Sequence, residues 1–441
     1  MQLVCCADFG STFTKTLLVS LDDSEVVAAA EHPTTIDTDV LNGLRACLDQ
    51  LARAVPGAVG APVLACSSAG GGLRIAVVGN EDLVTAEAGR RVALSSGGRV
   101  VHVGSGGLDV GRLAALRASE PDVVLLVGGT DGGNADVLVQ SAEALRSWHG
   151  PVVVAGNAAA TGRVTAILDA GQVPYDAADN VVPRIGVLAP ESARASIRAA
   201  FLRHVIGGKH LSSSEEFVEM VTGPTPDVVL TGAEMLADLV GDVTVVDVGG
   251  ATTDVHSVVD IDSEDAELSR QVVAPTRVTR TVEADLGMRW SAQTTIEQGV
   301  DTGVLSATEA DGTVGDLRLA EVAVAIAMRR HTGRQRVVLG TDGRVVERTG
   351  KDLREIRLLV GSGGVLRHAR TVDAELVLRA STGPDVEGGW LLPRSPRLVV
   401  DRAYVLAAVG LLAPSRPEVV TGLLRRHLAP GPPGETAADT A

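Results

Sequence analysis

The chain has 441 residues, enough for two or three domains, and its 55 acidic and 39 basic side chains give a net charge of −16. This charge argues against electrostatic capture of nucleic acid or of an anionic membrane surface. Three Trp, two Tyr and four Phe leave few rings for stacking on bases. Val, Leu, Ile and Ala with 50 Gly are typical of an α/β protein.

The N-terminal residues MQLVCCADFG lack the charged and apolar regions of a signal peptide. The sequence contains no apolar run near the roughly 20 residues that a membrane span needs. We therefore expect a cytoplasmic protein.

The first 78 residues predict short strands around one helix. Strands are expected over residues 2–7, 15–21, 25–30, 62–66 and 74–78, with a helix over 39–54. From there to about residue 185 the pattern becomes a regular alternation, which favours parallel βαβ units. The expected strands are 99–103, 123–127 and 152–155, and the expected helices are 108–118, 135–148 and 160–170.

Helices resume over residues 191–206 and 233–240, and a second strong strand begins at Val243. Beyond it, strands over 251–259, 277–282, 336–339 and 357–360 alternate with helices over 317–330, 364–369 and 402–413. The ending PGPPGETAADTA is too rich in Pro, Gly and Ala to pack, so residues 430–441 are expected to be a disordered tail.

The first motif with evident chemistry is DFGSTFTKT, from Asp8 to Thr16. A strand ends in Asp8, a glycine permits a tight turn, and hydroxyl side chains lead into a second strand. Such a hairpin can wrap a terminal phosphate, while Asp8 can hold the water shell of Mg²⁺. A hairpin without a ligand is the alternative. The candidate phosphate contacts are Gly10, Ser11, Thr12, Thr14 and Lys15, the last being the only lysine among the first 200 residues.

The second motif, VVDVGGATTDVHS, repeats this pattern from Val245 to Ser257, with Asp247 in the place of Asp8. Paired loops of this kind can clamp the phosphates of a nucleotide and its Mg²⁺ from opposite sides of a cleft. The candidate phosphate contacts here are Gly249, Gly250, Thr252 and Thr253.

The third motif, LLVGSGGVLRH, is a glycine-rich turn between a strand and a helix. Such a turn lets a ribose or a base approach the backbone closely. The candidate contacts are Gly361, Ser362, Gly363 and Gly364. The sequence has no GxxxxGK[ST] loop, so the motif is not a Walker loop.

These segments, followed by DRAYVLAAVGLL, resemble in order the phosphate-1, phosphate-2, adenosine and second-connect motifs of the actin/hexokinase/heat-shock-chaperone ATPase superfamily. The chain to about residue 428 more closely resembles the MutL/GlmL family, glutamate mutase component L. The segments SSAGGGLRIAVVG, LLVGGTDGGN, PVVVAGN and RTVEADLGMR carry that resemblance together with the two phosphate motifs.

The resemblance implies two actin-like, ribonuclease-H-like halves around a nucleotide cleft, with ATP and Mg²⁺ as cofactors. It implies an ATP-dependent accessory or reactivating chaperone that acts on an adenosylcobalamin-dependent mutase, of the glutamate mutase or aminomutase type. Asp8 and Asp247 match the aspartates that hold Mg²⁺ through water. Glu234, 13 residues before Asp247, is the candidate for orienting the attacking water, although a solvated helix carboxylate is an equal interpretation.

We expect residues 1–73 and 184–240 to form the first half and residues 241–429 the second, from which the terminal helices could return to the first. Residues 74–183 are expected to form an inserted, flavodoxin-like βαβ domain. It either docks beside the cobalamin domain of the mutase without binding cobalamin, or merely stabilises the first half. Its loop GGTDGGN, ending at Asn134, suits a phosphate, a hydroxyl-rich ligand or a helix cap.

Glu283, Asp285 and Arg289 could lie at the edge of the cleft, or could form a local ion pair at a helix start. Two other functions stay open at this point. One is a small-molecule kinase of the same superfamily, and the other is a nucleotide-dependent, actin-like scaffold.

Overall fold

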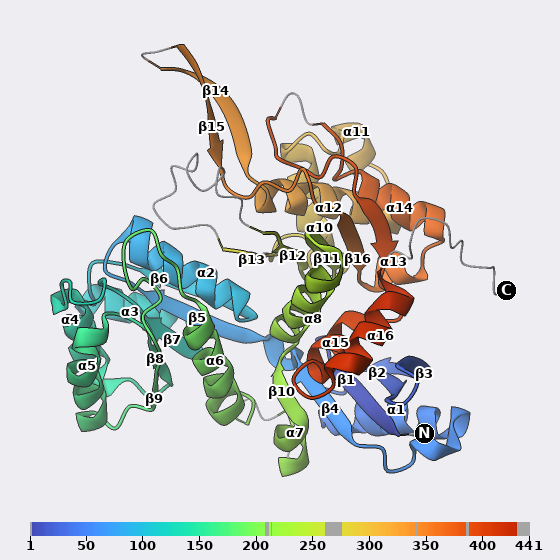
Figure 1. Ribbon diagram of the computed structural model, residues 1–441, viewed down its shortest axis with the longest axis horizontal. Helices are drawn as coiled ribbons and strands as arrows, with labels where there is room; N and C mark the ends of the chain where they lie inside the picture. The colour runs from blue at the N-terminus through green and yellow to red at the C-terminus, as the bar shows by residue number, and fades with distance from the viewer. Residues whose placement is uncertain are drawn as a thin grey trace.

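A computed structural model describes residues 2–207, 211–212, 214–260, 276–340, 343–384 and 388–429 of the chain (Figure 1). The expected tail over 430–441 lies outside these residues. Among the described residues, no helix combines the length and the apolar character that crossing a membrane requires.

The N-terminal sheet has five strands in the order β10-β4-β1-β2-β3. Strands β1 (Leu3–Phe9), β2 (Phe13–Ser20) and β3 (Glu25–Pro33) form an antiparallel meander. Strands β4 (Val63–Ser67) and β10 (Val221–Pro224) extend the sheet in parallel to β1. The sheet is therefore mixed.

A second mixed sheet repeats this arrangement, in the order β13-β12-β11-β16-β17. Its meander is β11 (Val243–Val248), β12 (Thr253–Val258) and β13 (Val278–Glu283). Strands β16 (Leu358–Ser362) and β17 (Arg397–Val400) add in parallel to β11. Counted along the chain, both sheets have the order 3-2-1-4-5, so the two units share one strand order.

A third sheet is entirely parallel and has the order β6-β5-β7-β8-β9, or 2-1-3-4-5 along the chain. This is the strand order of flavodoxin-like folds. The strands are β5 (Leu73–Val78), β6 (Gly98–Gly104), β7 (Val123–Leu126), β8 (Val152–Val154) and β9 (Tyr175–Ala177).

The helices cover the faces of these sheets (Figure 1). Those of the first 240 residues are α1 (Val40–Ala54), α2 (Glu87–Ser95), α3 (Val110–Ala118), α4 (Asp136–Ala144), α5 (Ala158–Ala170), α6 (Glu191–Ala200), α7 (Glu215–Met220) and α8 (Thr225–Val240). Those that follow are α10 (Ala292–Asp301), α11 (Ala307–Ala310), α12 (Asp316–His331), α13 (Gly364–His368), α14 (Thr371–Arg379), α15 (Val405–Leu412) and α16 (Pro417–His427). A hairpin of β14 (Arg334–Gly340) and β15 (Gly343–Thr349) projects from the second unit.

Helices α8 and α15 pack between the two mixed sheets. One apolar core joins residues of β1, β2 and β4 to residues of β11 and β16 through these helices and α16. Two glycines let α8 and α15 approach each other: a Cβ on Gly232 would lie 2.3 Å from the carbonyl oxygen of Leu406, and one on Gly410 would lie 1.9 Å from that of Val228. Helix α15 contacts β1 and β4, and α16 contacts β3, so the C-terminal helices lie against the N-terminal sheet.

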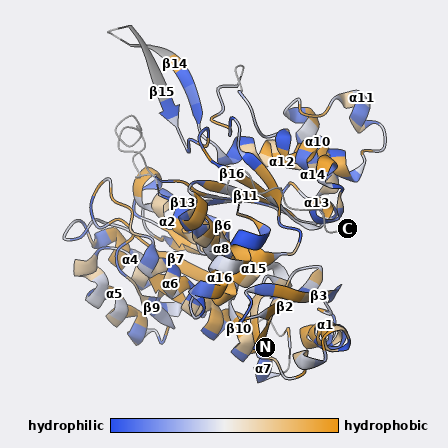
Figure 2. Cartoon of the chain, turned by 45° about the vertical axis from the view of Figure 1, so that its right-hand side comes forward, coloured by the Kyte–Doolittle hydropathy of each residue, from blue (hydrophilic) through white to orange (hydrophobic). Residues whose placement is uncertain are grey.

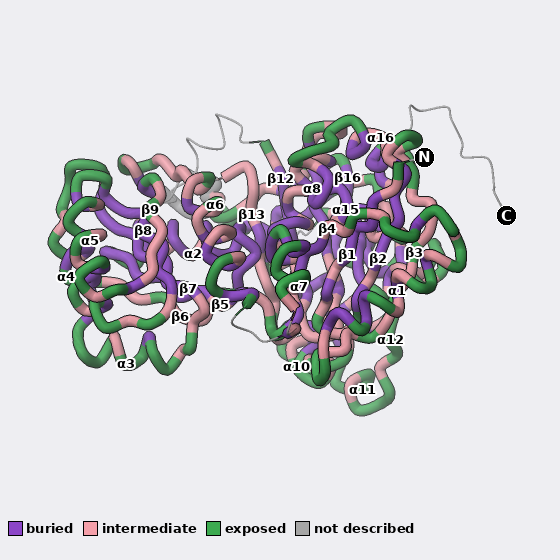
Figure 3. Tube along the Cα trace, turned by 90° about the horizontal axis from the view of Figure 1, so that it is seen from below, coloured by how far each residue is buried: buried purple, intermediate pink, exposed green. Residues whose placement is uncertain are grey.

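The parallel sheet shows the alternation of side chains expected for a strand buried on both faces. Ile75 and Val77 point into a core shared with the N-terminal sheet, whereas Ala76 and Val78 point into a core formed with α3, α4 and α5. Helix α6 lies on the first of these faces, against β7, β8 and β9. Figures 2 and 3 show the inner strands of the sheets as largely hydrophobic and buried, whereas edge strands such as β3 and β9 are mainly intermediate or exposed.

The structure confirms the α/β class, and it corrects one element that matters for the site. The predicted helix over 233–240 begins eight residues earlier, at Thr225. Pro226 lies in the first turn, where its missing N–H leaves no bond unmade. The earlier start places Thr225 beside Asp8.

Candidate nucleotide site

The two phosphate motifs form hairpins with the same turn. The Gly10 N–H donates to the Phe13 carbonyl at 3.1 Å, and the Gly249 N–H donates to the Thr252 carbonyl at 2.9 Å. A Cβ on Gly10 would lie 2.7 Å from the Phe13 oxygen, and one on Gly249 would lie 2.8 Å from the Thr252 oxygen. Each turn thus requires its glycine, and the predicted strand–turn–strand arrangement is confirmed at both positions.

An aspartate is the next-to-last residue of the first strand of each hairpin. Asp8 lies opposite Lys15 in the β1–β2 register and accepts a hydrogen bond of 2.6 Å from the Thr225 hydroxyl. Asp247 lies opposite Asp254 in the β11–β12 register and accepts a hydrogen bond from the Ser362 hydroxyl. Each carboxylate is therefore held by a hydroxyl from another element of its own unit.

The Lys15 ammonium connects the two units. It lies 3.9 Å from the centre of the Tyr404 ring, a cation–π contact with the start of α15. Burial opposes the charge of Lys15, but the carboxylates of Asp8 and Asp247 together with Tyr404 outweigh burial and raise its pKa. The ammonium is thus charged and interacts electrostatically with both aspartates, as expected of a lysine that binds phosphate.

The carboxyls of Asp247 and Asp401 both have raised pKa values. Burial raises the pKa of Asp247, reinforced by Asp254 and opposed by Lys15. Asp401 is buried and accepts hydrogen bonds from the Val405 and Leu406 N–H groups at 2.9 and 3.0 Å, at the start of α15. Burial raises the pKa of Asp401 to about 6, although these two bonds favour its charged form.

Asp401 makes stability depend on pH in a predictable direction. Because its pKa in the folded protein, about 6, exceeds the ordinary aspartate value of 3.8, its contribution to stability is complete below pH 4 and is lost as the pH rises through 6. We expect this loss to be about 3 kcal/mol in the free energy of unfolding. Urea unfolding of wild type and Asp401→Asn between pH 4 and 8 measures it, since the variant should lack this part of the pH dependence. Parallel pH profiles for the two proteins would contradict the prediction.

The third predicted loop lies beside the second hairpin. Ser362 pairs with Asp247 in the parallel β11–β16 register, so the end of β16 reaches the same edge as the end of β11. Gly363 has φ of +104°, and a Cβ there would lie 2.2 Å from the Val248 carbonyl oxygen. Gly361 is enclosed by Leu366 and Leu378, while Gly364, the first residue of α13, faces open space.

Gly363 and Gly364 offer a matched pair of substitutions. Gly363→Ala forces both a left-handed conformation and a backbone clash, so we expect a loss of about 2 kcal/mol or more in the free energy of unfolding. Gly364→Ala fills open space at a helical position and should be neutral or stabilising by up to about 1 kcal/mol. Thermal unfolding compares the two variants, and equal effects would contradict this account of the turn.

The other predicted contact residues differ from one another in how far they are exposed. Ser11 is exposed and Thr12 is half-buried in the first turn, whereas Thr14 and Thr253 are buried. Thr14 lies 3.4 Å from the Thr34 hydroxyl. The Thr253 hydroxyl has no hydrogen-bond partner within the described part of the chain.

Glu234 does not lie beside Asp8 or Asp247. It lies nine residues beyond Thr225 on α8, roughly 13 Å along the helix axis. There its carboxylate pairs with Arg194 of α6 at 3.2 Å. The residue of α8 that reaches the site is Thr225, which the sequence analysis did not single out because the helix was expected to begin later.

The turn of the second hairpin is linked to the parallel sheet through Arg280. The Thr252 hydroxyl donates to Asp254 at 3.1 Å, and Arg280 of β13 donates two hydrogen bonds to the same carboxylate at 2.5 and 3.0 Å. The Arg280 side chain also donates to the carbonyls of Leu94 and Gly98, at 3.1 and 3.0 Å, where α2 ends and β6 begins. Arg280 is only 4% exposed.

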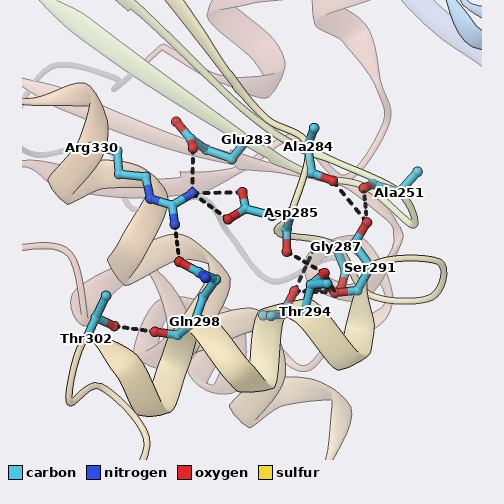
Figure 4. Close-up of polar contacts among 11 residues, drawn as sticks. Ala251, Glu283, Ala284, Asp285, Gly287, Ser291, Thr294, Gln298, Thr302 and Arg330 are labelled. Atoms are coloured by element: carbon cyan, nitrogen blue, oxygen red, sulfur yellow. Dashed lines mark hydrogen bonds and ion pairs between the residues drawn. The ribbon is translucent and has the colours of Figure 1, made fainter.

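The segment RTVEADLGMRWS, which follows in the chain, also contacts the turn of the second hairpin (Figure 4). Arg330 of α12 binds Glu283 at 2.8 Å and Asp285 at 2.7 Å, so these carboxylates form an ion-pair cluster. The Ser291 hydroxyl donates to the Ala251 carbonyl at 2.7 Å. Arg289 donates its backbone N–H to the Gly250 carbonyl at 2.8 Å, while its guanidinium lies over Trp290.

The sequence analysis missed Tyr404, Arg367 and Asp401 as individual site residues. The guanidinium of Arg367 lies 4.8 Å from the centre of the Tyr404 ring and pairs with Glu31 of β3 at 2.9 Å. The motif DRAYVLAAVGLL contained a usable signal, because an Asp three residues before a Tyr precedes an apolar helix. The Cys66 thiol also lies near the site, 3.6 Å from the Asp8 carboxylate.

The residues present suit a magnesium ion held mainly by a nucleotide. Among the described residues, no group of three His, Cys, Asp or Glu side chains is placed to hold a metal. Mg²⁺ is commonly bound by one or two carboxylates together with waters and substrate phosphates. Asp8 and Asp247 can supply those two carboxylates.

Comparison with solved structures gives matches of low similarity. A nucleotide-free structure of acetone carboxylase matches with a TM-score of 0.42 and 14% identity, over 93% of this chain and 70% of that one. The activator of 2-hydroxyisocaproyl-CoA dehydratase from Clostridium difficile matches at 0.31 and 9%, over 98% and 100%. The xylulose kinase from Bifidobacterium adolescentis matches at 0.31 and 9%, over 97% and 93%. All three TM-scores are below 0.5.

Sequence comparison gives a stronger result. The family model described as MutL protein matches residues 4–316 and 300–428. The protein MutL of Clostridium tetanomorphum is 34% identical over 463 aligned positions, which cover 97% of this chain and 99% of that protein. The chain therefore belongs to the MutL protein family.

Proposed function

We propose that this protein is an ATPase that binds Mg²⁺–ATP between its two mixed sheets. The observation that supports this most directly is the pair of Asp–Gly hairpins, with Lys15 electrostatically coupled to both Asp8 and Asp247. Each hairpin comes from a sheet of the same strand order, and α8 and α15 pack between the sheets. Two units that share a core of this kind can close on a ligand and open again.

Each group at the site then has a role. The N–H groups and hydroxyls of the two turns would contact phosphate oxygens, and Lys15 would offset their charge. Asp8 and Asp247 would hold Mg²⁺ through its waters, and the bound ion would neutralise charge that develops on the phosphates. The glycines at positions 361, 363 and 364, with Ser362, would form the surface for the adenosine.

The residue that orients the attacking water can be identified by a paired comparison. Thr225 donates to Asp8 and lies in the first turn of α8, whereas Glu234 is engaged with Arg194. We expect Thr225→Val to lower the rate of phosphate release about tenfold or more, and Glu234→Gln to change it less. A steady-state assay of phosphate release compares them. The opposite ranking would return the role to Glu234.

We further propose that ATP turnover serves an adenosylcobalamin-dependent mutase of the glutamate mutase or aminomutase type, which the protein reactivates. Family membership supports this partner, and the Arg280 contacts give a route by which closure at Thr252 can reach the parallel sheet. We also propose that residues 74–183 form the inserted domain that faces the mutase. The first half would then comprise residues 1–73 and 184–240.

Capture of the partner tests this proposal. Immobilised protein is incubated with a candidate mutase and with ATP, ADP or no nucleotide. Capture that depends on the nucleotide is expected, and it should be lost when residues 74–183 are deleted, provided that the shortened chain still binds ATP. Equal failure with every candidate, together with a phosphorylated small-molecule product, would instead indicate a kinase.

A further inference from the structure

The parallel sheet is joined to the rest of the chain near the amino ends of its strands. Strand β5 begins at Leu73, shortly after β4 of the N-terminal sheet ends. A Cβ on Gly97, just before β6, would lie 2.7 Å from the backbone nitrogen of Asp227 in α8, and Arg280 of β13 donates to the carbonyl of Gly98. Because all five strands are parallel, their carboxyl ends and the loops that follow lie at the opposite edge of the sheet.

This carboxyl edge carries the exposed apolar side chains of the region. Within residues 73–190, all of which the structure describes, four large apolar side chains are exposed, from 44% at Val103 to 88% at Val110. Leu83 follows β5, Val103 is the next-to-last residue of β6, Val110 begins α3, and Ile185 lies between β9 and α6. Single exposed apolar residues are ordinary, but a set confined to one edge marks an interaction surface.

The four side chains lie around the end of the sheet. Leu83 leads into α2 and Ile185 leads into α6, and these two helices contact each other on the face that shares a core with the N-terminal sheet. Both helices return along the sheet after a strand, so both begin at the carboxyl edge. Val110 begins α3, which packs on the other face. The apolar surface therefore extends from one face of the sheet to the other across this edge.

Hydrogen bonds connect the loops of the carboxyl edge to one another. The Gly106 N–H donates to the Asn80 carbonyl at 2.9 Å, which joins the loop after β6 to the loop after β5. The Asp131 N–H donates to the Pro183 carbonyl at 3.0 Å, and the Asn180 amide donates to the Asp131 carboxylate at 2.8 Å. These two bonds join the loop after β7 to the segment before α6. A surface that is already held in place loses little conformational entropy when a partner binds.

The exposed charges at the carboxyl edge are mainly negative. Seven exposed carboxylates stand against two exposed guanidiniums, those of Arg112 and Arg184. The carboxylates are those of Glu81, Asp82, Asp109, Asp131, Asp136, Asp179 and Glu191. Protein interfaces have an apolar centre and a polar rim, and the charges of the two partners are complementary. An apolar surface with a negative rim fits a protein with a positive rim, and it repels nucleic acid and anionic membranes.

We propose that the carboxyl edge of the parallel sheet is a docking surface for a partner protein whose matching face has apolar side chains surrounded by lysine and arginine. This inference rests on the proposed function, because it names the edge and the chemistry by which residues 74–183 bind the mutase. The partner binds at the edge opposite to the contacts of Arg280. It therefore leaves the links between the parallel sheet and the two ATPase units in place.

Binding of a purified candidate mutase to the immobilised full chain tests the proposal, with the nucleotide that gives the strongest capture. The double variant Leu83→Ser, Ile185→Ser should raise the Kd at least about tenfold, because it removes two apolar contacts from the centre of the interface. Val372→Ser, Leu376→Ser is the matched control, since both residues are exposed on α14 of the second unit, and its Kd should be that of wild type. Unchanged binding by the edge variant, or equal losses in both variants, would overturn the proposal.

Charge reversal tests the positive rim of the partner. Asp82→Lys with Asp179→Lys should slow association with the mutase about tenfold at low salt, and should reduce the dependence of the association rate on salt. Asp301→Lys with Asp311→Lys, two exposed residues of the second unit, is the matched control and should associate like wild type. Faster or unchanged association of the edge variant would contradict a positive partner face.

The outcomes separate this inference from the proposed function. Capture of the mutase by wild type that survives the edge substitutions overturns the docking surface alone. Failure of wild type to capture any candidate contradicts the mutase partner and overturns the docking surface with it. Sedimentation of the chain by itself gives the remaining alternative: self-association that Leu83→Ser, Ile185→Ser abolishes would assign the edge to a second copy and overturn the proposal. ATP turnover without the mutase should equal that of wild type in both edge variants, because their substitutions lie outside the nucleotide site.

Discussion

Replacement of Asp247 by asparagine is expected to abolish ATP turnover while leaving the fold intact. The amide has nearly the size of the carboxylate and can still accept from Ser362, so the packing at the end of β11 is kept. It carries no negative charge, however, so the water shell of Mg²⁺ loses one of its two carboxylates and Lys15 loses one of its two partners. We expect the rate of phosphate release to fall by about 10²- to 10³-fold or more.

A coupled assay of phosphate release measures this effect, and thermal unfolding confirms that the fold is kept. Because burial raises the pKa of Asp247, removing its charge should not lower the melting temperature. Asp311→Asn, an exposed aspartate in the same unit, is the matched control and should turn over ATP like wild type. Turnover by Asp247→Asn at the wild-type rate would remove the central claim of the proposed function.

Arg280→Met is expected to have the largest effect on stability. The guanidinium makes four hydrogen bonds while nearly fully buried, two to Asp254 and one each to the carbonyls of Leu94 and Gly98. Methionine fills much of the same volume but leaves the Asp254 carboxylate without its cation. Breaking a buried ion pair by removing one partner costs about 3–5 kcal/mol, and we expect a loss of that size in the free energy of unfolding.

Arg277→Met is the matched control, because Arg277 lies in the same segment and also pairs with two carboxylates. Its partners Asp238 and Asp260 are about half and three quarters exposed, so solvent screens these pairs. We expect a loss below about 1 kcal/mol. Urea unfolding compares the variants, and similar losses for both would show that Arg280 is not the main polar link.

From the Arg280 contacts we also expect nucleotide binding to change the dynamics of the parallel sheet. A phosphate at Thr252 competes for the hydroxyl that now donates to Asp254, and Asp254 holds Arg280. Amide hydrogen exchange over residues 87–104 should therefore change when a non-hydrolysable ATP analogue binds, and Arg280→Met should suppress the change. An unchanged exchange pattern in wild type with bound analogue would contradict the coupling but not the ATP site.

The local parts of the candidate site could be predicted from the sequence. An Asp at a strand end, a glycine, hydroxyl residues and a second strand specify a hairpin whose geometry is decided within about eight residues. The turns at Gly10 and Gly249 accordingly match the prediction, and so does the position of Lys15. The regular alternation of strand and helix segments likewise indicated the parallel strands β5, β7 and β8, which are short continuous apolar runs because both of their faces are buried.

The start of α8 could not be predicted in the same way. Gly232 interrupts the helical pattern and the pair Thr225-Pro226 suggests a turn, so the local signal favoured a later start. Packing decided otherwise, because Gly232 is where Leu406 of α15 approaches α8. That approach depends on a residue 174 positions away (406 − 232 = 174).

The sequence by itself determined the α/β class, the two phosphate hairpins, the glycine turn after β16 and membership of the family, because each depends on residues adjacent in the chain. Only the tertiary structure decided that the two mixed sheets share one strand order, that Thr225 rather than Glu234 contacts Asp8, and that Tyr404 lies against Lys15. It also decided that Arg280 joins the second turn to the parallel sheet. These contacts join segments tens to hundreds of residues apart, and no periodicity in the sequence specifies them.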